Sequence, residues 1–332
     1  MGSDADKSKA KSVPESKSAT DFTPNTEIWY SDGSVVLVAK NIAYRVHATI
    51  MAAHCEVFKD MFSMPQPSVS DPDAETHEDV PVLRLQDDPV DLKHLLKAIY
   101  EHSYFSAGQQ TKFPVVASVL RMSTKYDAPF LRQRAIDLLS TAYPSTLAAW
   151  DNRASQRLVP PFENELAIVI ELAYETDVRV ILPAAYFAAS REPLSFVLPE
   201  FRRLSVVPDA QWDLCRDFVI GRERLQQAEI TNILAFLEPT FLRPNCQTSN
   251  DATTILNTSR NGLRKIFDSE PYHQWCSAHP AEAGKALVLC VNCCTVVENS
   301  IREGRKNVWS QLPGLFGLAN WETLRARDGI TQ

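Results

Sequence analysis

Two side chains near the start of the folded sequence have the types needed for acid–base chemistry. Asp32 and His47 are a carboxylate and an imidazole, and a carboxylate beside an imidazole can orient the ring and stabilise its charged form. A catalytic site also needs a nucleophile and hydrogen-bond donors for the negative charge that develops in the reaction. Neither pattern is visible beside this pair, so the sequence offers no complete catalytic set here.

The cysteines of the second half raise the possibility of a metal site. Cys290 and Cys293 have the C-x2-C spacing of half a zinc site. Two more ligands would have to come from the other cysteines and histidines of this half: Cys246, His273, Cys276 and His279. However, Cys290 and Cys294 lie on an apolar helical stripe, and a buried free cysteine behaves as a small hydrophobic residue. We therefore expect core packing and no bound metal or other cofactor, with a structural zinc site as the alternative.

Arginine and tryptophan are the other residue types with binding potential. Residues 142–332 hold 16 Arg and 3 Lys against 22 acidic residues, and the arginines are dispersed. The guanidinium fork suits carboxylate and phosphate contacts, but this balance favours solvated, salt-bridged faces over a nucleic-acid groove. Four tryptophans could form an aromatic ligand box, although packing within a helical core is the expected role: Trp212, Trp275, Trp309 and Trp321.

Composition excludes several classes of protein. The chain has 332 residues, a net charge of −7 and only 10 glycines, and the glycine-rich nucleotide-binding loops are absent. Its apolar runs fall short of the ~18–20 residues that a membrane helix needs. The N-terminus has no apolar signal region, and seven cysteines in a chain of this size favour reduced thiols. We expect an intracellular protein, cytoplasmic or nuclear, that does not contact membranes.

The first half of the chain alternates between strand and helix patterns. After a polar tail at 1–22, short strands are predicted at 34–39, 42–46 and 82–85. A single amphipathic helix is predicted over 49–62, and a surface loop over 64–81. Asp88 and Pro89 predict a capped helix over 89–100. Two more helices follow, at 114–122 and 131–139.

The second half carries almost no strand pattern. Helices are predicted at 162–174, 180–190, 230–237 and 282–306, with a polar loop at 244–260. Another helix is predicted to begin at Asp209, and its apolar stripe would consist of Trp212, Cys215, Val219 and Leu225.

Several spaced motifs of the first half resemble the BTB/POZ family. They are the block at 32–38 with an Asp before the first strand, the aromatic-basic-x-His segment at 44–47, and the helix at 50–62 that ends in Met-Phe. Segments at 82–85, 92–100 and 120–127 follow in the family's order. The resemblance covers about residues 27–141. Looser likenesses near residues 62–67 and 309–321 connect the chain with BTB proteins of mushroom-forming fungi.

The resemblance implies an α+β fold, with a short three-stranded sheet covered by helices and an all-α domain after it. The implied organisation is a disordered tail at 1–22, a BTB/POZ domain at 23–143 and a helical domain at 144–332. It also implies structural roles, not catalytic ones, for five residues: Asp32, His47, Phe58, Met61 and Phe62. Asp32 and His47 would hold the junction between strand and helix.

The family resemblance implies a non-enzymatic protein that recognises other proteins. Two features of the family are weak in this chain: residues 21–30 contain Pro24 and leave no room for the helix that dimerising members carry before the first strand. The loop at 63–81 has no hydrophobic-x-Glu motif of the kind found in cullin-binding members. Self-association, a cullin-linked substrate adaptor for ubiquitin transfer, and a nuclear regulator that contacts corepressors remain open alternatives.

Overall fold

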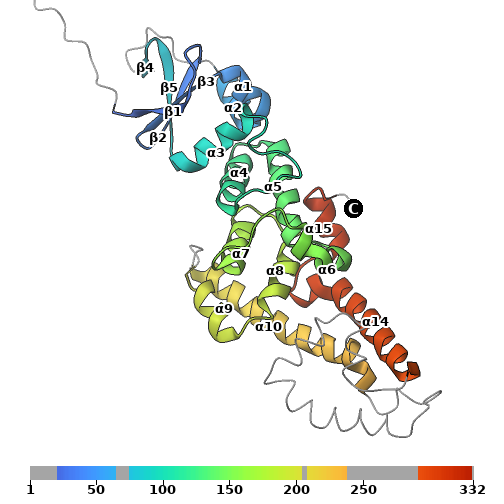
Figure 1. The fold of residues 1–332 in the computed structure, drawn as a ribbon. Helices are drawn as coiled ribbons and strands as arrows, with labels where there is room; N and C mark the ends of the chain where they lie inside the picture. Colours follow the sequence, from blue (N-terminus) through green and yellow to red (C-terminus); the bar gives the residue numbers. More distant parts are fainter. Residues whose placement is uncertain (1–20, 65–74, 204–207, 238–290, 331–332) are drawn as a thin grey trace, which may run out of the picture. The chain divides into compact units, whose positions relative to one another are not determined.

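The computed structural model describes residues 21–64, 75–203, 208–237 and 291–330. The described residues form two compact units, which divide between residues 99 and 100. The first unit is a sheet with helices, and the described part of the second contains helices and no strand (Figure 1). The predicted α+β class is therefore confirmed.

The first unit contains one five-stranded mixed sheet, not the three strands predicted. The strand order is β1-β3-β2-β5-β4. β1 and β2 pair in parallel with β3 and β5 respectively, whereas β2–β3 and β4–β5 are antiparallel. The strands have these bounds: β1 Thr23–Trp29, β2 Val35–Ala39, β3 Ile42–Val46, β4 Thr76–His77 and β5 Val80–Leu85.

The central strand, β2, is buried along its whole length. Its five residues are all apolar, which is the pattern of a strand covered on both faces. Val36 and Val38 point to one face, where Phe22 joins their cluster. Leu37 and its partner Tyr44 point to the other face, where the Tyr44 hydroxyl donates to the carbonyl of Pro89 at 2.6 Å. That bond places the start of α3 against this face of the sheet.

α3 (Pro89–Tyr100) begins as the sequence predicts. The Asp88 carboxylate accepts a hydrogen bond from the backbone N–H of Val90 at 2.9 Å and also pairs with Lys40 at 2.8 Å. An aspartate before the first turn satisfies an N–H that has no partner within the helix. The lysine holds the pKa of Asp88 below its ordinary value, with help from the N–H of Val90.

The predicted single helix over 49–62 is wrong, because the structure breaks it in two at Cys55. α1 is Ala48–His54 and α2 is Glu56–Ser63, and Cys55 between them has extended backbone with φ −134° and ψ 114°. The break lets each short helix bury its own anchor. Met51 and Phe58 are both fully buried.

β1 and β4 are strands where the sequence predicted none. β1 lies at the sheet edge, where Pro24 is tolerated because an edge strand can leave one side of its backbone unpaired. The Asn25 side chain accepts from the N–H groups of Glu27 and Ile28, and the register shifts between Pro24 and Trp29. β4 and the first residues of β5 lie inside the predicted 64–81 loop.

The second unit is a set of helices that the sequence predicted only in part. α6, α9 and α15 were not predicted, and α10 extends past the predicted break near Ile230. The α elements have these bounds: α4 Phe113–Lys125, α5 Pro129–Ala142, α6 Leu147–Gln156, α7 Glu165–Glu175, α8 Leu182–Ala189, α9 Leu194–Phe201, α10 Pro208–Asn232, α14 Val291–Leu315 and α15 Trp321–Arg327. A 3-10 turn, η1, covers Leu234–Leu237.

α10 and α14 lie side by side and run in opposite directions (Figure 1). Two glycines make this approach possible. A Cβ on Gly304 would lie 2.4 Å from the carbonyl oxygen of Asn232, and one on Gly221 would lie 2.1 Å from the ring of Phe316. Because α14 begins at Val291 in the described part of the chain, residues 282–290 of the predicted helix lie outside it.

The boundary predicted at 143/144 falls inside the second compact unit. α4 contacts α7 and α5 contacts α6, and Arg121 of α4 pairs with Glu175 of α7 at 2.8 Å. The proposed division between domains therefore does not coincide with the division between compact units at residues 99 and 100. The predicted tail to residue 20 and the 244–260 loop lie outside the described residues. None of the described helices is both long and apolar enough to cross a membrane.

Candidate functional site

A large, mainly apolar groove lies between α9 and α10. We call it the α9–α10 groove. α10 carries two apolar stripes, and only one faces the core. Leu214, Phe218 and Leu225 are buried, with the Phe218 ring 5.1 Å from that of Phe201 in α9. The apolar stripe predicted from the sequence is divided between the two, because Leu225 is buried whereas Trp212 and Val219 are exposed.

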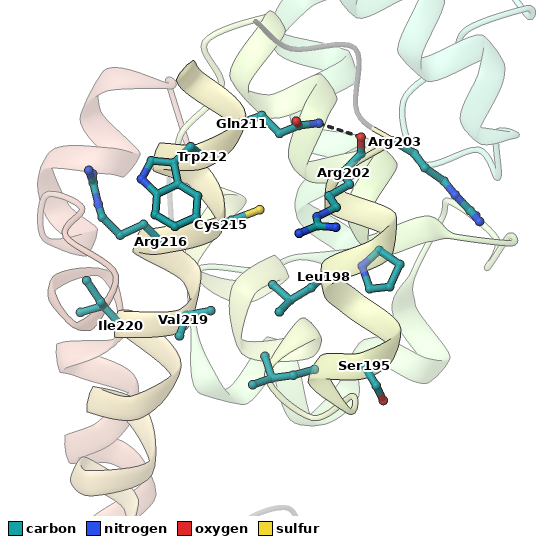
Figure 2. A pocket seen from close by; sticks show the side chains of 12 residues that line it. Ser195, Leu198, Arg202, Arg203, Gln211, Trp212, Cys215, Arg216, Val219 and Ile220 are labelled. Atoms are coloured by element: carbon teal, nitrogen blue, oxygen red, sulfur yellow. Dashed lines mark hydrogen bonds between the residues drawn. The ribbon is translucent and has the colours of Figure 1, made fainter. Parts of the chain in front are cut away.

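The groove has a volume of about 900 Å³ and is bounded on both sides by apolar side chains (Figure 2). α10 contributes Trp212, Val219 and Ile220, whose exposed fractions are 69%, 39% and 38%. α9 contributes Leu194 and Leu198, one helical turn apart. A contiguous exposed apolar surface of this kind usually marks a site that binds another molecule.

Arg202 is a cation that faces the groove and forms no ion pair with any described carboxylate. Figure 2 shows the Arg202 side chain extending into the space between the helices, whereas Arg203 turns away. Arg203 pairs with Glu200 at 2.7 Å, and Arg216 pairs with Asp213 and Asp217 at 2.7 and 2.8 Å; these acids are its neighbours on α10. Within the described residues, Arg202 has no ion pair. The groove is therefore an apolar channel with one positive charge available to a ligand.

Hydrogen bonds join the end of α9 to the start of α10 at one end of the groove. The Gln211 amide donates to the carbonyls of Phe201 and Arg202 at 3.1 and 2.8 Å. These bonds satisfy carbonyls that the end of α9 leaves unpaired. Cys215 lines the floor, and burial raises the pKa of its thiol, which disfavours the reactive thiolate. The groove is suited to binding rather than to cysteine chemistry.

The structure brings Asp32 and His47 together at the junction between strand and helix. His47 Nε2 lies 3.2 Å from Asp32 Oδ1, and the hydrogen bond from His47 lowers the pKa of the Asp32 carboxyl. The Asp32 side chain is 82% exposed. Next to this pair, the Ser34 hydroxyl accepts from the backbone N–H of Ala48, the first residue of α1, at 3.0 Å. The contact joins the turn before β2 to His47, the residue that precedes α1.

The three other residues of the predicted structural set lie on α2. Phe58 is fully buried, whereas Met61 and Phe62 are half-buried. The rings of Phe58 and Phe62 stack with centroids 5.8 Å apart. Val57, on the same helix, is 36% exposed. The helix therefore buries one ring completely and uses the next to cover it.

The zinc candidates Cys246, Cys276 and Cys290 lie outside the described residues, as do His273 and His279. Cys293 lies on α14, but its side chain is not among those described. The parts of the chain that the structure describes hold no group of three or more residues able to ligate a metal ion.

Three of the four tryptophans considered from the sequence are placed by the structure. Trp309 and Trp321 are buried and stack with centroids 5.8 Å apart, as core packing requires. The Trp321 indole also donates to the carbonyl of Trp309 at 2.7 Å. Trp212 instead lies at the surface of the groove, and Trp275 falls outside the described residues. The expectation of core packing is thus wrong for Trp212.

Sequence reasoning missed the α9 wall of the groove. The stretch from Leu194 to Phe201 contains Pro199, which reads as a helix breaker, and the helix has only eight residues. The sequence did contain a signal for this helix. Leu194 and Leu198 are spaced to share one face, and Val197 and Phe201 are spaced to share the opposite, buried face.

Comparison with protein families places one domain in the chain. Residues 30–143 match the model of the BTB/POZ domain. The chain therefore contains a BTB/POZ domain, a module for protein–protein interaction, followed by a helical region. Comparisons with curated proteins and with solved structures found no match.

Proposed function

We propose that this protein is a non-enzymatic adaptor that binds one protein through its BTB/POZ domain and a second through the α9–α10 groove. The groove carries the proposal, because it gives the helical half a binding surface separate from the residues matched to the domain. The occupant we propose is an amphipathic helix of a partner protein. Its apolar face would cover Trp212 and Val219, and an acidic residue would pair with Arg202.

The dimensions of the groove support a helical occupant. Its α10 wall runs from Gln211 to Ile220, about 14 Å at 1.5 Å per residue, which matches two to three turns of a helix. Exposed tryptophan and arginine are the residue types that dominate binding energy at protein interfaces. An acidic group in the partner would give Arg202 the charge complement that the described residues do not supply.

We propose two more specific roles for the protein. A cullin-linked adaptor for ubiquitin transfer uses both surfaces, since the groove would recruit the substrate. A nuclear regulator would instead contact corepressors and needs nuclear residence. We propose the adaptor role first, because the groove lies in the half that such an adaptor uses for its substrate. The likeness of the second half to fungal BTB proteins suggests a fungal source for the chain.

Affinity purification with mass spectrometry from native cells tests this proposal. The tagged full chain is compared with Trp212→Ala and with Phe130→Ala, a control aromatic that is 66% exposed outside the groove. We expect at least one partner to be retained by wild type and by Phe130→Ala but lost from Trp212→Ala, and to bind again when both purified proteins are mixed. An identical set of partners for all three would refute the groove. Co-purified cullin distinguishes the adaptor from the regulator.

A further inference from the structure

A second cavity lies beside α6, α8 and α14 and shares no lining residue with the α9–α10 groove. Its volume is about 300 Å³. The wall combines two aromatic rings, three arginines and one carboxylate: Trp150, Phe187, Arg153, Arg191, Arg305 and Asp151. The cluster could not be recognised from a local sequence pattern, because its arginines are up to 152 residues apart in the sequence.

Two of the three arginines are neutralised by carboxylates. Arg191 pairs with both oxygens of Glu229, whose side chain is 1% exposed. Arg305 pairs with Asp151. Each of these ion pairs contributes no net charge, and each holds its guanidinium at the wall of the cavity.

Arg153 is the third cation, and it has no carboxylate partner within the described residues. Its guanidinium carbon lies 3.4 Å from the centroid of the Trp150 ring, so the cation stacks on the face of the indole. Burial lowers the pKa of Arg153, although arginine stays protonated at neutral pH. Stacking on the indole covers one flat face of the guanidinium and leaves its N–H edges available for hydrogen bonds.

We propose that this cavity binds a phosphate group, carried either by a small molecule or by a phosphorylated partner. The three guanidinium groups around the cavity offer many N–H donors. Because two of the arginines are neutralised by Glu229 and Asp151, these five side chains together carry a net charge of +1. Arginine clusters recognise phosphate because the planar fork matches its oxygens in pairs. The remaining volume and the Trp150 and Phe187 rings leave room for the group that carries the phosphate.

Phosphate binding by the full chain tests the proposal directly. Inorganic phosphate, adenosine monophosphate and a phosphoserine peptide are each titrated at constant ionic strength, with chloride as the reference anion. Binding is followed by calorimetry and by the rise in melting temperature that a ligand of the folded state produces. We expect all phosphate probes to bind and chloride not to. The tighter of the two carriers identifies the source, a small molecule or a partner.

Two variants and one control decide the role of Arg153. Arg153→Gln should weaken phosphate binding about tenfold, and Arg153→Lys should weaken it too, because it keeps the charge but loses the fork. Arg224→Gln, an exposed arginine on α10, removes the same charge elsewhere and should leave binding unchanged. Equal effects of phosphate and chloride on wild type would overturn the proposal. The proposal would also be overturned if the folded Arg153 variants bound phosphate as tightly as wild type, or if Arg224→Gln lost as much phosphate binding as they do.

Discussion

Replacing Phe58 by alanine is the sharpest test of how the first unit is held together. The ring is fully buried on α2, so the substitution removes a complete phenyl group from a packed interior. Large-to-small changes of this kind cost about 3–5 kcal/mol, through lost transfer energy and the cavity left behind. We expect the lower end of that range, because Phe62 stacks on the ring and is only half-buried, so it can move into part of the space.

Native-state hydrogen exchange gives the free energy of unfolding for this unit in the full chain. The amides of β2 report it, since this strand lies at the centre of the sheet and is buried throughout. Phe58→Ala should lower their opening free energy by about 3 kcal/mol, and Phe130→Ala, which truncates an exposed ring, should lower it by less than about 0.5 kcal/mol. A loss below about 1 kcal/mol in Phe58→Ala would show that α2 does not anchor the sheet.

Four further outcomes are expected. The pairing of Glu27 with Lys93 and Lys97 lowers the pKa of its carboxyl from 4.5 to about 2, so this stabilisation is complete above about pH 4.5 and is lost as the pH falls toward 2. Glu27→Gln should therefore flatten the dependence of stability on pH across that window, measured by denaturant melts. Asp328→Ala should cost about 1–3 kcal/mol, because its carboxylate accepts from the buried N–H of Val180 at 2.7 Å; Asp328→Asn keeps an acceptor and should cost less, and equal losses would argue against the hydrogen bond. Sedimentation at tens of micromolar should find a monomer or a weak dimer, since residues 21–30 contain strand β1 and leave no room there for a dimerising helix; a dimer that persists below about 1 μM would contradict this. Elemental analysis should find less than about half an equivalent of zinc, and a full equivalent lost with folding in Cys290→Ser would reverse that expectation.

Local signals made part of the first unit predictable. The five apolar residues of β2 specify a strand buried on both faces, whatever surrounds it. Asp88 followed by Pro89 specifies where α3 begins, because both residues act within the first turn. In each of these places the neighbouring residues alone fix the backbone.

The features that could not be predicted depend on distant partners. β1 is a strand because β3 offers it an edge, although Pro24 and Asn25 favour a turn. The break at Cys55 has no glycine or proline to announce it. It follows from two anchors on separate helices that both need burial.

The groove was missed for the same reason. α10 carries two stripes of apolar residues with the same helical period, and periodicity cannot tell which one faces the core. That choice is made by Phe316, whose ring packs against Gly221 of α10 from nearly a hundred residues away and lies near Phe218. The remaining stripe, with Trp212, is left exposed.

Site-specific photo-crosslinking tests most directly whether the α9–α10 groove recruits a partner. A photo-reactive amino acid replaces Val219 in the full chain in native cells, and in a second, otherwise identical variant it replaces Phe130, outside the groove. We predict a crosslink from position 219 to a partner segment that forms an amphipathic helix with an acidic residue, abolished by Trp212→Ala and absent from position 130. Crosslinks that are the same at both positions, or that survive Trp212→Ala, would contradict recruitment through the groove.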